Sequence, residues 1–218
     1  MAEPVVDVVI PVRDGSDLVL DAVSSVRAQG PVVAGLVAVD NGSVDDTAAV
    51  LAAAGVRVLS EETPGAGAAR RLGLAHTSAP YVMFLDHDDV LGDGVLAELA
   101  GVLDRTGADV AFGQAVNETL PGFDGTAAVR HLGAAHAAPI SSAVLVDRRA
   151  FDRYGPMEDD NFSWGRWFLA AGRAGARVES LDLVVCRRRI HGANVSLQPG
   201  SQAALFAMIR EHRRASDA

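Results

Sequence analysis

Three carboxylates within four residues are the part of this chain best suited to chemistry. Asp86, Asp88 and Asp89 directly follow the apolar run 81–85. Such a short apolar run is typical of a buried strand and is too short to span a membrane. Ligands of open α/β sheets bind beyond the carboxyl ends of strands, and Mg²⁺ or Mn²⁺ often joins carboxylates to substrate phosphates. The segment therefore predicts a metal–diphosphate site, and the alternative is an acidic turn that caps the next helix.

An EF-hand calcium loop does not fit the same segment. Such a loop requires Gly at its sixth position and Glu at its twelfth. Counted from Asp86, those positions hold Leu91 and Ala97.

The composition limits the class of protein. With 218 residues, 49% of them hydrophobic, the chain suits one large domain, or one domain with an appended subdomain. The 19 basic and 28 acidic residues give a net charge of −9, which argues against non-specific nucleic-acid binding. A nucleotide ligand remains compatible, because a bound metal inverts the local charge.

Cysteine and hydropathy point to a protein of the cytoplasm. The only cysteine, Cys186, lies in an apolar run, so we expect a core residue and neither a disulfide framework nor a Cys-based zinc site. The N-terminus has no signal-like pattern, and no apolar run has the length of a membrane helix. We therefore expect a soluble cytoplasmic protein without a membrane span.

Strands and helices alternate in the first half of the sequence. We expect strands at residues 5–12, 35–39, 56–59 and 81–85. We expect helices at 15–29, from Ser43 or Asp45 to Ala54, at 65–75 and for about a dozen residues from Asp93, with Asp14 or Ser16 capping the first. This alternation predicts an α/β fold with a mostly parallel, doubly wound sheet.

The second half is less regular. It predicts strands at 108–116 and 140–146, two strands within 176–190, and helices at 148–154 and 162–174. Residues 117–138 read as a long loop with at most one helical turn, and such loops are often functional. A last helix at 201–214 has Leu205, Met208, Ile209 and His212 on one face, and would pack on the domain or on the partner subunit of a homodimer.

Seven segments, in this order, resemble the family 2 inverting glycosyltransferases of the GT-A fold. They are VVIPVRDG, VAVDNGSVDDT, GAGAARRLGL, FLDHDD, ISSAVLVDRRAF, MEDD and RRRIHGANVS. The resemblance covers residues 5–197. It implies a nucleotide-diphospho-sugar transferase fold with a nucleotide-sugar-binding half at 1–115, an acceptor and catalytic half at 116–200, and a C-terminal helix at 201–218.

The resemblance implies a set of nucleotide-binding residues. Pro11 and Val12 would lie near the base and ribose, beside Arg13, where the family often has Tyr. Asp40 would accept a hydrogen bond from a base N–H, since a carboxylate suits an edge that presents a donor. Asp45 and Asp46 read instead as residues at a helix N-terminus.

The Gly-rich segment adds Gly67 and Arg70 to this site. By resemblance Arg70 faces the base and diphosphate, whereas Arg71 stands where the family usually has Asn. The G-x-G-x-x-R pattern is not the dinucleotide fingerprint, because Arg70 replaces the third Gly, and this argues against an NAD enzyme. The alternative for either arginine is a surface salt bridge.

The D-x-D motif and the R-x-H motif would together hold Mn²⁺ or Mg²⁺. By resemblance Asp86 contacts ribose or metal-bound water, Asp88 ligates the cation and His191 completes the metal site. Arg189 would contact the diphosphate. His87 belongs to the same nucleotide segment but should point away from the metal, because side chains alternate along a strand.

The general base is expected in the acidic run 158–160. If the family's E-D motif is aligned by residue type, it falls on Glu158 and Asp159, and Asp159 is the base. If the alignment is instead anchored on Gly172, Asp160 takes that position. The alternative is that the run only opens the helix near Phe162. Trp164 or Trp167 would either stack against the acceptor or belong to the core.

The resulting hypothesis is a metal-dependent, inverting glycosyltransferase that uses a nucleoside-diphosphate sugar. UDP is the expected nucleotide, with GDP or dTDP as alternatives. Segments 117–138 and 156–168 would shape the pocket for a soluble acceptor: a small molecule, a peptide or an oligosaccharide. The small chain favours a tailoring enzyme.

Two other functions stay open. A sugar-1-phosphate nucleotidyltransferase would need a Gly-rich signature with Lys near the first strand, which VVIPVRDGSD lacks. A non-catalytic nucleotide-sugar-binding protein would keep the pocket without the base.

Overall fold

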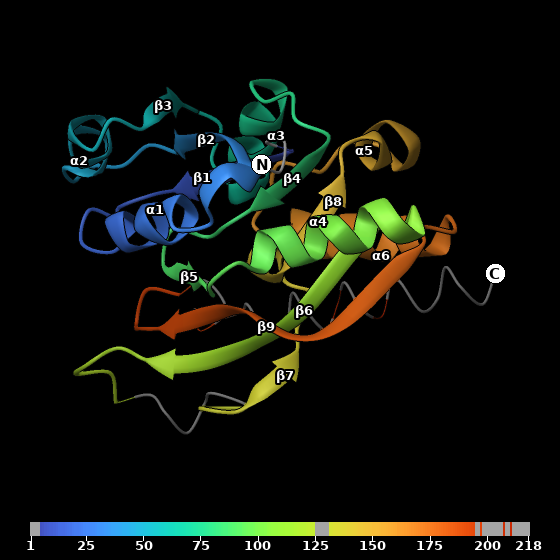
Figure 1. The fold of residues 1–218 in the computed structure, drawn as a ribbon. Helices are drawn as coiled ribbons and strands as arrows, with labels where there is room; N and C mark the ends of the chain where they lie inside the picture. Colours follow the sequence, from blue (N-terminus) through green and yellow to red (C-terminus); the bar gives the residue numbers. More distant parts are fainter. Residues whose placement is uncertain (1–4, 125–130, 195–196, 198–206, 208–209, 211–218) are drawn as a thin grey trace.

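The computed structural model describes residues 5–124, 131–194, 197, 207 and 210. Its strands form one sheet in the order β3-β2-β1-β4-β8-β6-β9-β5, with β7 paired to β6 (Figure 1). The face residues of the helix expected at 201–214 lie outside the described residues. No helix within the described part of the chain is long and apolar enough to cross a membrane.

The first half confirms the predicted parallel, doubly wound arrangement. Its strands are β1 (Val6–Val12), β2 (Val33–Asp40), β3 (Arg57–Ser60) and β4 (Tyr81–Phe84). They alternate with α1 (Val19–Arg27), the 3₁₀ turn η1 (Gly30–Val32), α2 (Thr47–Ala53) and α3 (Ala66–Ala75). β1 pairs in parallel with β2 on one side and β4 on the other, so the chain reverses its direction of winding there. In open α/β sheets this switch point is where ligands bind.

The second half makes the sheet mixed. β8 (Val144–Asp147) lies antiparallel between β4 and β6 (Val110–Thr119), and β9 (Val178–Ile190) runs parallel to β6. β5 (Asp89–Leu91) and β7 (Ala135–Ala137) complete it. The remaining helical elements are α4 (Val95–Thr106), η3 (Ser141–Ala143), α5 (Arg149–Tyr154) and α6 (Ser163–Arg173). β6 runs across residue 115, where we expected the two halves of the chain to meet.

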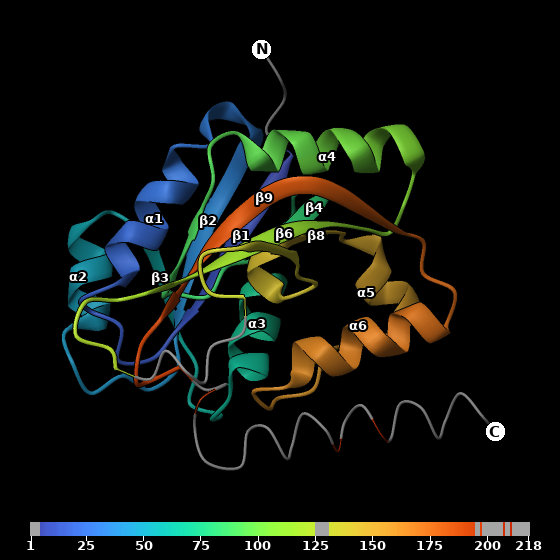
Figure 2. The same cartoon turned by 90° about the horizontal axis from the view of Figure 1, so that it is seen from below.

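Helices cover both faces of the sheet, giving three layers (Figure 2). One hydrophobic cluster joins the sheet to α1, α2 and α4, and the other joins it to α3, α5 and α6. Along β1 the side chains alternate between them, with Val8 and Ile10 in the first and Val9 in the second. Cys186 is buried in the first cluster, as the sequence predicted.

The expectation of two strands within 176–190 is wrong, because β9 is continuous there. Its pairing with β6 shifts register between Phe112 and Ala115, so an irregularity within one strand takes the place of a turn. Gly113 allows this close approach, because a Cβ on it would lie 2.5 Å from the Leu183 carbonyl oxygen.

Helix α1 begins at Val19, later than predicted, because the preceding residues bind a neighbouring loop. The Asp14 N–H donates to Ser43 Oγ at 2.9 Å, and the Gly15 N–H donates to Thr47 Oγ1 at 2.9 Å. The Ser16 N–H donates to Asp45 Oδ2 at 3.1 Å. The expected caps of α1 therefore hold together the loops that follow β1 and β2.

Candidate active site

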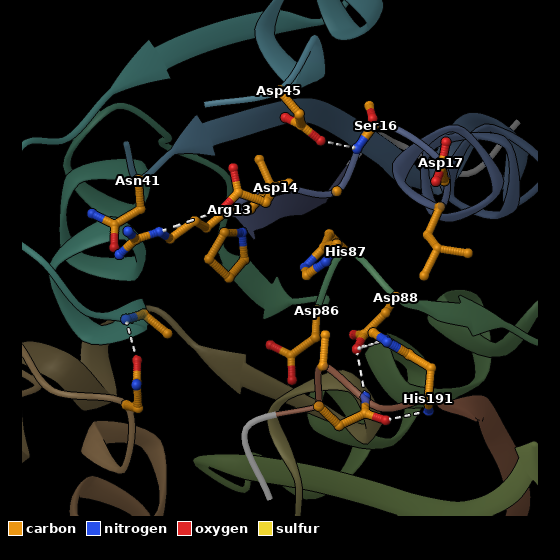
Figure 3. Close-up of a pocket in the computed structure, with 18 of the residues that line it drawn as sticks. Arg13, Asp14, Ser16, Asp17, Asn41, Asp45, Asp86, His87, Asp88 and His191 are labelled. Carbon is orange, nitrogen blue, oxygen red and sulfur yellow. Dashed lines mark hydrogen bonds and ion pairs between the residues drawn. The ribbon is translucent and has the colours of Figure 1, made fainter. Parts of the chain in front are cut away.

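A cavity of about 1160 Å³ lies at the carboxyl ends of β1 and β4, at the switch point of the sheet (Figure 3). Its walls come from the loops after β1, β2 and β4, from the start of α3, and from segments around residues 160 and 190. Nine of the residues that the sequence predicts for the substrate and metal site line it: Pro11, Val12, Arg13, Arg70, Asp86, His87, Asp88, Asp160 and His191.

Asp88 and His191 form the pair best suited to a cation. His191 Nε2 lies 3.0 Å from Asp88 Oδ2, and both side chains are mostly buried. Asn194 donates to the same oxygen at 2.7 Å. A carboxylate oxygen and an imidazole nitrogen are both common metal ligands. No group of three or more His, Cys, Asp or Glu side chains within the described residues could hold a metal, so further ligands would come from substrate and water.

The pKa values of the adjacent carboxyls of Asp88 and Asp89 are shifted in opposite directions. Burial raises the pKa of Asp88, but the hydrogen bond to His191 and the nearby His87 outweigh this effect and hold it below its ordinary value. Burial, followed by the negative charges of Asp88 and Asp86, raises the pKa of Asp89 well above its ordinary value. Asp88 is therefore the carboxylate that stays ionised for a cation, whereas Asp89 belongs to β5 and is buried.

Arg70 approaches the cavity with unused donors. It is 5% exposed, and its Nη2 donates to Asp86 Oδ1 at 2.8 Å and to Ser141 Oγ at 3.2 Å. Its Nε and Nη1 are buried and have no hydrogen-bond partner among the described residues. Because buried donors are rarely left unpaired, these two atoms are available to a ligand group or an ordered water.

His87 lines the cavity, and the expectation that it points away from the metal stays a prediction. The strand ends at Phe84, and the Asp89 N–H donates to the Asp86 carbonyl at 3.0 Å, which closes a turn. A turn breaks the alternation of side chains, so His87 points into the cavity (Figure 3). A Cβ on Gly15 would lie 2.4 Å from its ring, so glycine makes room for it.

The turn after β2 presents Asn41, not Asp40, to the cavity. Asp40 Oδ1 accepts hydrogen bonds from the backbone N–H and the hydroxyl of Ser43, and Asp40 is not among the lining residues. Asn41 lines the cavity, and its Nδ2 donates to the carbonyls of Glu61 and Thr63. Sequence reasoning missed Asn41 because the Asn-Gly pair read only as a turn.

The acidic run 158–160 is docked on the first turn of α3. The Gly67 N–H donates to the Asp160 carbonyl and the Ala68 N–H to the Asp159 carbonyl, both at 3.1 Å. Gly67 is required there, because its Cβ would lie 2.0 Å from the Glu158 carbonyl oxygen.

The three carboxylates of this run pair with two arginines. Asp159 pairs with Arg71 and does not line the cavity, whereas Asp160 lines the cavity and pairs with Arg166. Glu158 is 2.9 Å from Arg166 Nε. Asp160 also accepts a hydrogen bond from the Phe162 N–H at 2.8 Å, so it opens α6 as well as facing the cavity.

Two further predicted site residues do not line the cavity. Trp164 is 6% exposed, donates to the Pro139 carbonyl at 2.8 Å and packs beside Phe84 and Trp167 in the core. Arg189 is buried beneath the D-x-D loop and is not among the lining residues. Of the segment 117–138, Leu120 lines the cavity, and residues 125–130 lie outside the described residues.

The fold and site define a doubly wound α/β protein of the GT-A class, with a nucleotide-sized cavity at its switch point. The chain belongs to the Glycosyl transferase family 2, whose profile matches residues 7–185. The family named on sequence resemblance is thereby confirmed.

Two curated relatives illustrate the range of the family. The uncharacterized glycosyltransferase Rv0539 of Mycobacterium tuberculosis is 35% identical over 114 residues, which are 52% of this chain and 50% of that protein. The succinoglycan biosynthesis protein ExoU of Rhizobium meliloti is 36% identical over 98 residues, 42% of this chain and 28% of that protein. The chain thus aligns with half or less of the length of these relatives.

Solved structures share the fold at low sequence identity. Glucosyl-3-phosphoglycerate synthase from Mycobacterium tuberculosis, in complex with Mn²⁺, UDP and phosphoglyceric acid, has a TM-score of 0.72 and 19% identity, covering 95% of this chain and 78% of that one. S. aureus TarS 1-349 in complex with UDP-GlcNAc has a TM-score of 0.69 and 16% identity, covering 95% and 65%.

Proposed function

We propose that the protein is a metal-dependent, inverting glycosyltransferase that moves a sugar from a nucleoside-diphosphate sugar to a hydroxyl of an acceptor. The observation that carries the proposal is the paired Asp88 and His191 in the switch-point cavity, 3.0 Å apart. The unpartnered donors of Arg70 in the same cavity add a site for negative charge. Together they suit a cation and a diphosphate side by side.

Different residues of the cavity would bind different parts of the sugar donor. Asp88 and His191 would hold Mg²⁺ or Mn²⁺, which when bound supplies Lewis-acid neutralisation of the leaving diphosphate. Arg70 would donate to the diphosphate, and Asp86, fixed by Arg70, would accept from a sugar or ribose hydroxyl. Asn41, Pro11 and Val12 would line the nucleoside end of the cavity.

Asp160 is the better placed of the two candidate bases. Asp160 lines the cavity, whereas Asp159 does not, and its carboxylate pairs with Arg71 on α3. As base, Asp160 takes the proton of the acceptor hydroxyl while the oxygen attacks the anomeric carbon opposite the diphosphate. The bond from that carbon to the diphosphate breaks, and the configuration inverts.

UDP is the nucleotide we propose for the donor. The solved structures that share the fold include complexes with UDP, UDP-glucose and UDP-GlcNAc. The acceptor would be a small molecule, a peptide or an oligosaccharide, and the protein a tailoring enzyme.

Nucleotide binding tests the donor site. UDP, GDP and dTDP are each added with Mn²⁺ and again with EDTA while thermal unfolding is followed. UDP at ~100 times its dissociation constant should stabilise the fold by about 2.7 kcal/mol, and EDTA should remove this effect. Asp88→Ala should keep the fold and lose the Mn²⁺-dependent part. Retained metal-dependent binding in that variant would refute the role of Asp88.

Turnover tests the base and separates the alternatives. Asp160→Asn should lower kcat by about 10²–10⁴-fold, whereas Asp159→Asn should change it much less. The reverse order would transfer the role to Asp159, and full rate in both would refute a base in this run. Pyrophosphate release from a nucleoside triphosphate and a sugar phosphate would instead identify a nucleotidyltransferase. Nucleotide binding without turnover of any UDP-sugar, hydrolysis included, would favour a binding protein.

A further inference from the structure

Arg189 is an arginine of the site region whose side chain turns away from the cavity. It lies on β9, is 9% exposed, and does not line the cavity. Its Nε donates to the Asp88 carbonyl at 2.6 Å. Its Nη1 donates to Asp21 Oδ2 at 2.5 Å, and its Nη2 donates to the Leu18 carbonyl at 3.0 Å. One guanidinium thus joins the D-x-D loop to the first turn of α1.

The backbone of the same residue holds two further parts of the site. The Arg189 N–H donates to Asp89 Oδ1 at 3.3 Å, and the Arg189 carbonyl accepts from Asn194 Nδ2 at 3.2 Å. Asn194 also accepts from the His191 N–H at 2.6 Å and donates to Asp88 Oδ2 at 2.7 Å. Asp88 is therefore held at its carbonyl by Arg189 and at its carboxylate by Asn194.

We infer that Arg189 is a positioning residue that fixes Asp88 and His191 for the cation, and that Asp21 on the surface of α1 anchors it. The inference rests on the proposed function and assigns Arg189 no contact with the diphosphate. Each of the three nitrogens of the guanidinium already donates to a protein oxygen, and Arg189 does not line the cavity. Lysine cannot replace it, because one ammonium lacks the planar fork that reaches three separate acceptors.

Asp21 gives the inference its sharpest test, because it lies outside the cavity. Its side chain is 65% exposed, and it lies in the first turn of α1. Glu98 also lies in the first turn of its helix, α4, and is also exposed, which makes Glu98→Ala a control for Asp21→Ala. Both changes remove a carboxylate near a helix N-terminus, but only Asp21 contacts Arg189.

The experiment measures Mn²⁺ binding directly. Free Mn²⁺ is followed by electron paramagnetic resonance at a fixed UDP concentration, with a UDP-only blank, at a temperature where every variant is folded. Disruption of residues that orient metal ligands weakens metal affinity by about 10- to 100-fold. We expect Asp21→Ala at about the lower limit and Arg189→Lys toward the upper limit of that range. Two control variants should bind Mn²⁺ like the unsubstituted protein. One is Glu98→Ala, and the other is Arg187→Lys, which changes an exposed arginine of β9 that is paired with Glu118.

The outcomes separate this inference from the proposed function. If the unsubstituted protein binds Mn²⁺ and Asp88→Ala does not, the metal site stands. Unchanged affinity in Asp21→Ala together with Arg189→Lys would then overturn the positioning role alone. If the unsubstituted protein binds no Mn²⁺, the proposed cation site fails, and the positioning role fails with it. Should Arg189→Lys not fold, the surface variant Asp21→Ala decides the question.

Discussion

At the scale of single residues, the side chains of adjacent residues point to different surroundings, because each pair lies at a turn. Asp88 faces His191 and the cavity, whereas Asp89 begins β5 and is 1% exposed. The same holds for Asp40 and Asn41, and for Asp159 and Asp160. In each pair one residue lines the cavity and the other does not. A catalytic motif read by letters alone cannot distinguish such neighbours.

Substitution of Gly67 should displace the backbone of the acidic run 158–160 and so disturb the site. Gly67→Ala would place a Cβ 2.0 Å from the Glu158 carbonyl oxygen, and a backbone atom cannot give way cheaply. We expect a loss of about 1–3 kcal/mol in the free energy of unfolding, together with weaker UDP binding. Chemical denaturation and a UDP titration measure the two effects.

Gly172→Ala is the control for that substitution. Gly172 lies within α6, and a Cβ on it would meet no atom within 4 Å. Alanine should raise the free energy of unfolding by up to about 1 kcal/mol there, because it lowers the entropy of the unfolded chain. Equal destabilisation by both substitutions would show that the Gly67 contact with the acidic run has no special effect.

At the scale of elements, short polar contacts fix the helices that carry the site. The loops after β1 and β2 hold each other through Asp14, Ser43 and Thr47, and the acidic run holds the start of α3 through backbone hydrogen bonds. These contacts join segments far apart in the sequence. The cavity walls are therefore set by loop-to-loop hydrogen bonds and not by any one strand or helix.

Tyr81 links β4 to α4 and should make stability depend on alkaline pH. Its hydroxyl donates to Asp104, and burial, followed by that hydrogen bond, raises the pKa of Tyr81 above its ordinary value. The stabilisation by the protonated hydroxyl is fully present below about pH 10, the pKa in the unfolded chain. It is lost as pH rises through the higher pKa of the folded state.

Tyr81→Phe should reveal this dependence. At pH 7 the variant should lose about 0.5–1.5 kcal/mol, the usual contribution of one hydrogen bond. Above pH 10 the difference between the two proteins should shrink and then reverse. Urea unfolding at pH 7, 9, 10 and 11 measures it, and a difference that stays constant over this range would contradict the assigned pKa direction.

At the scale of the whole molecule, one sheet separates two hydrophobic clusters. Leu99 on α4 is fully buried in one cluster, and both tryptophans lie on α6 in the other. Because the strands between them belong to both clusters, we expect the two faces to unfold together. The cavity lies at one end of this sheet, away from α4.

Leu99→Ala tests this cooperativity. It should lower the free energy of unfolding by about 2–5 kcal/mol, and tryptophan fluorescence and far-UV circular dichroism should show the same shift in midpoint. The affinity for UDP with Mn²⁺ should stay unchanged. Leu20→Ala, at a position 40% exposed, should change stability by less than about 0.5 kcal/mol. A fluorescence midpoint that did not move would indicate that the two faces unfold separately.

The sequence by itself determined most elements of the first half of the chain and the order of the motifs. Apolar runs and turn residues placed the first four strands and most helices, and the D-x-D and R-x-H segments brought Asp88 and His191 into one hypothesis. These signals are local, because hydrophobic period and turn chemistry act within a few residues. The sequence missed β5, whose three residues gain pairing only from β9, distant in the chain.

Only the tertiary structure decided which side chains share the cavity. In the structure Arg189 points away from the cavity and binds Asp21, Trp164 packs against Phe84 in the core, and Asn41 lines the cavity. Side-chain direction at a turn depends on the hydrogen bonds that the turn makes with distant segments. Periodicity holds only while a strand or helix continues, and this site is built where the strands end.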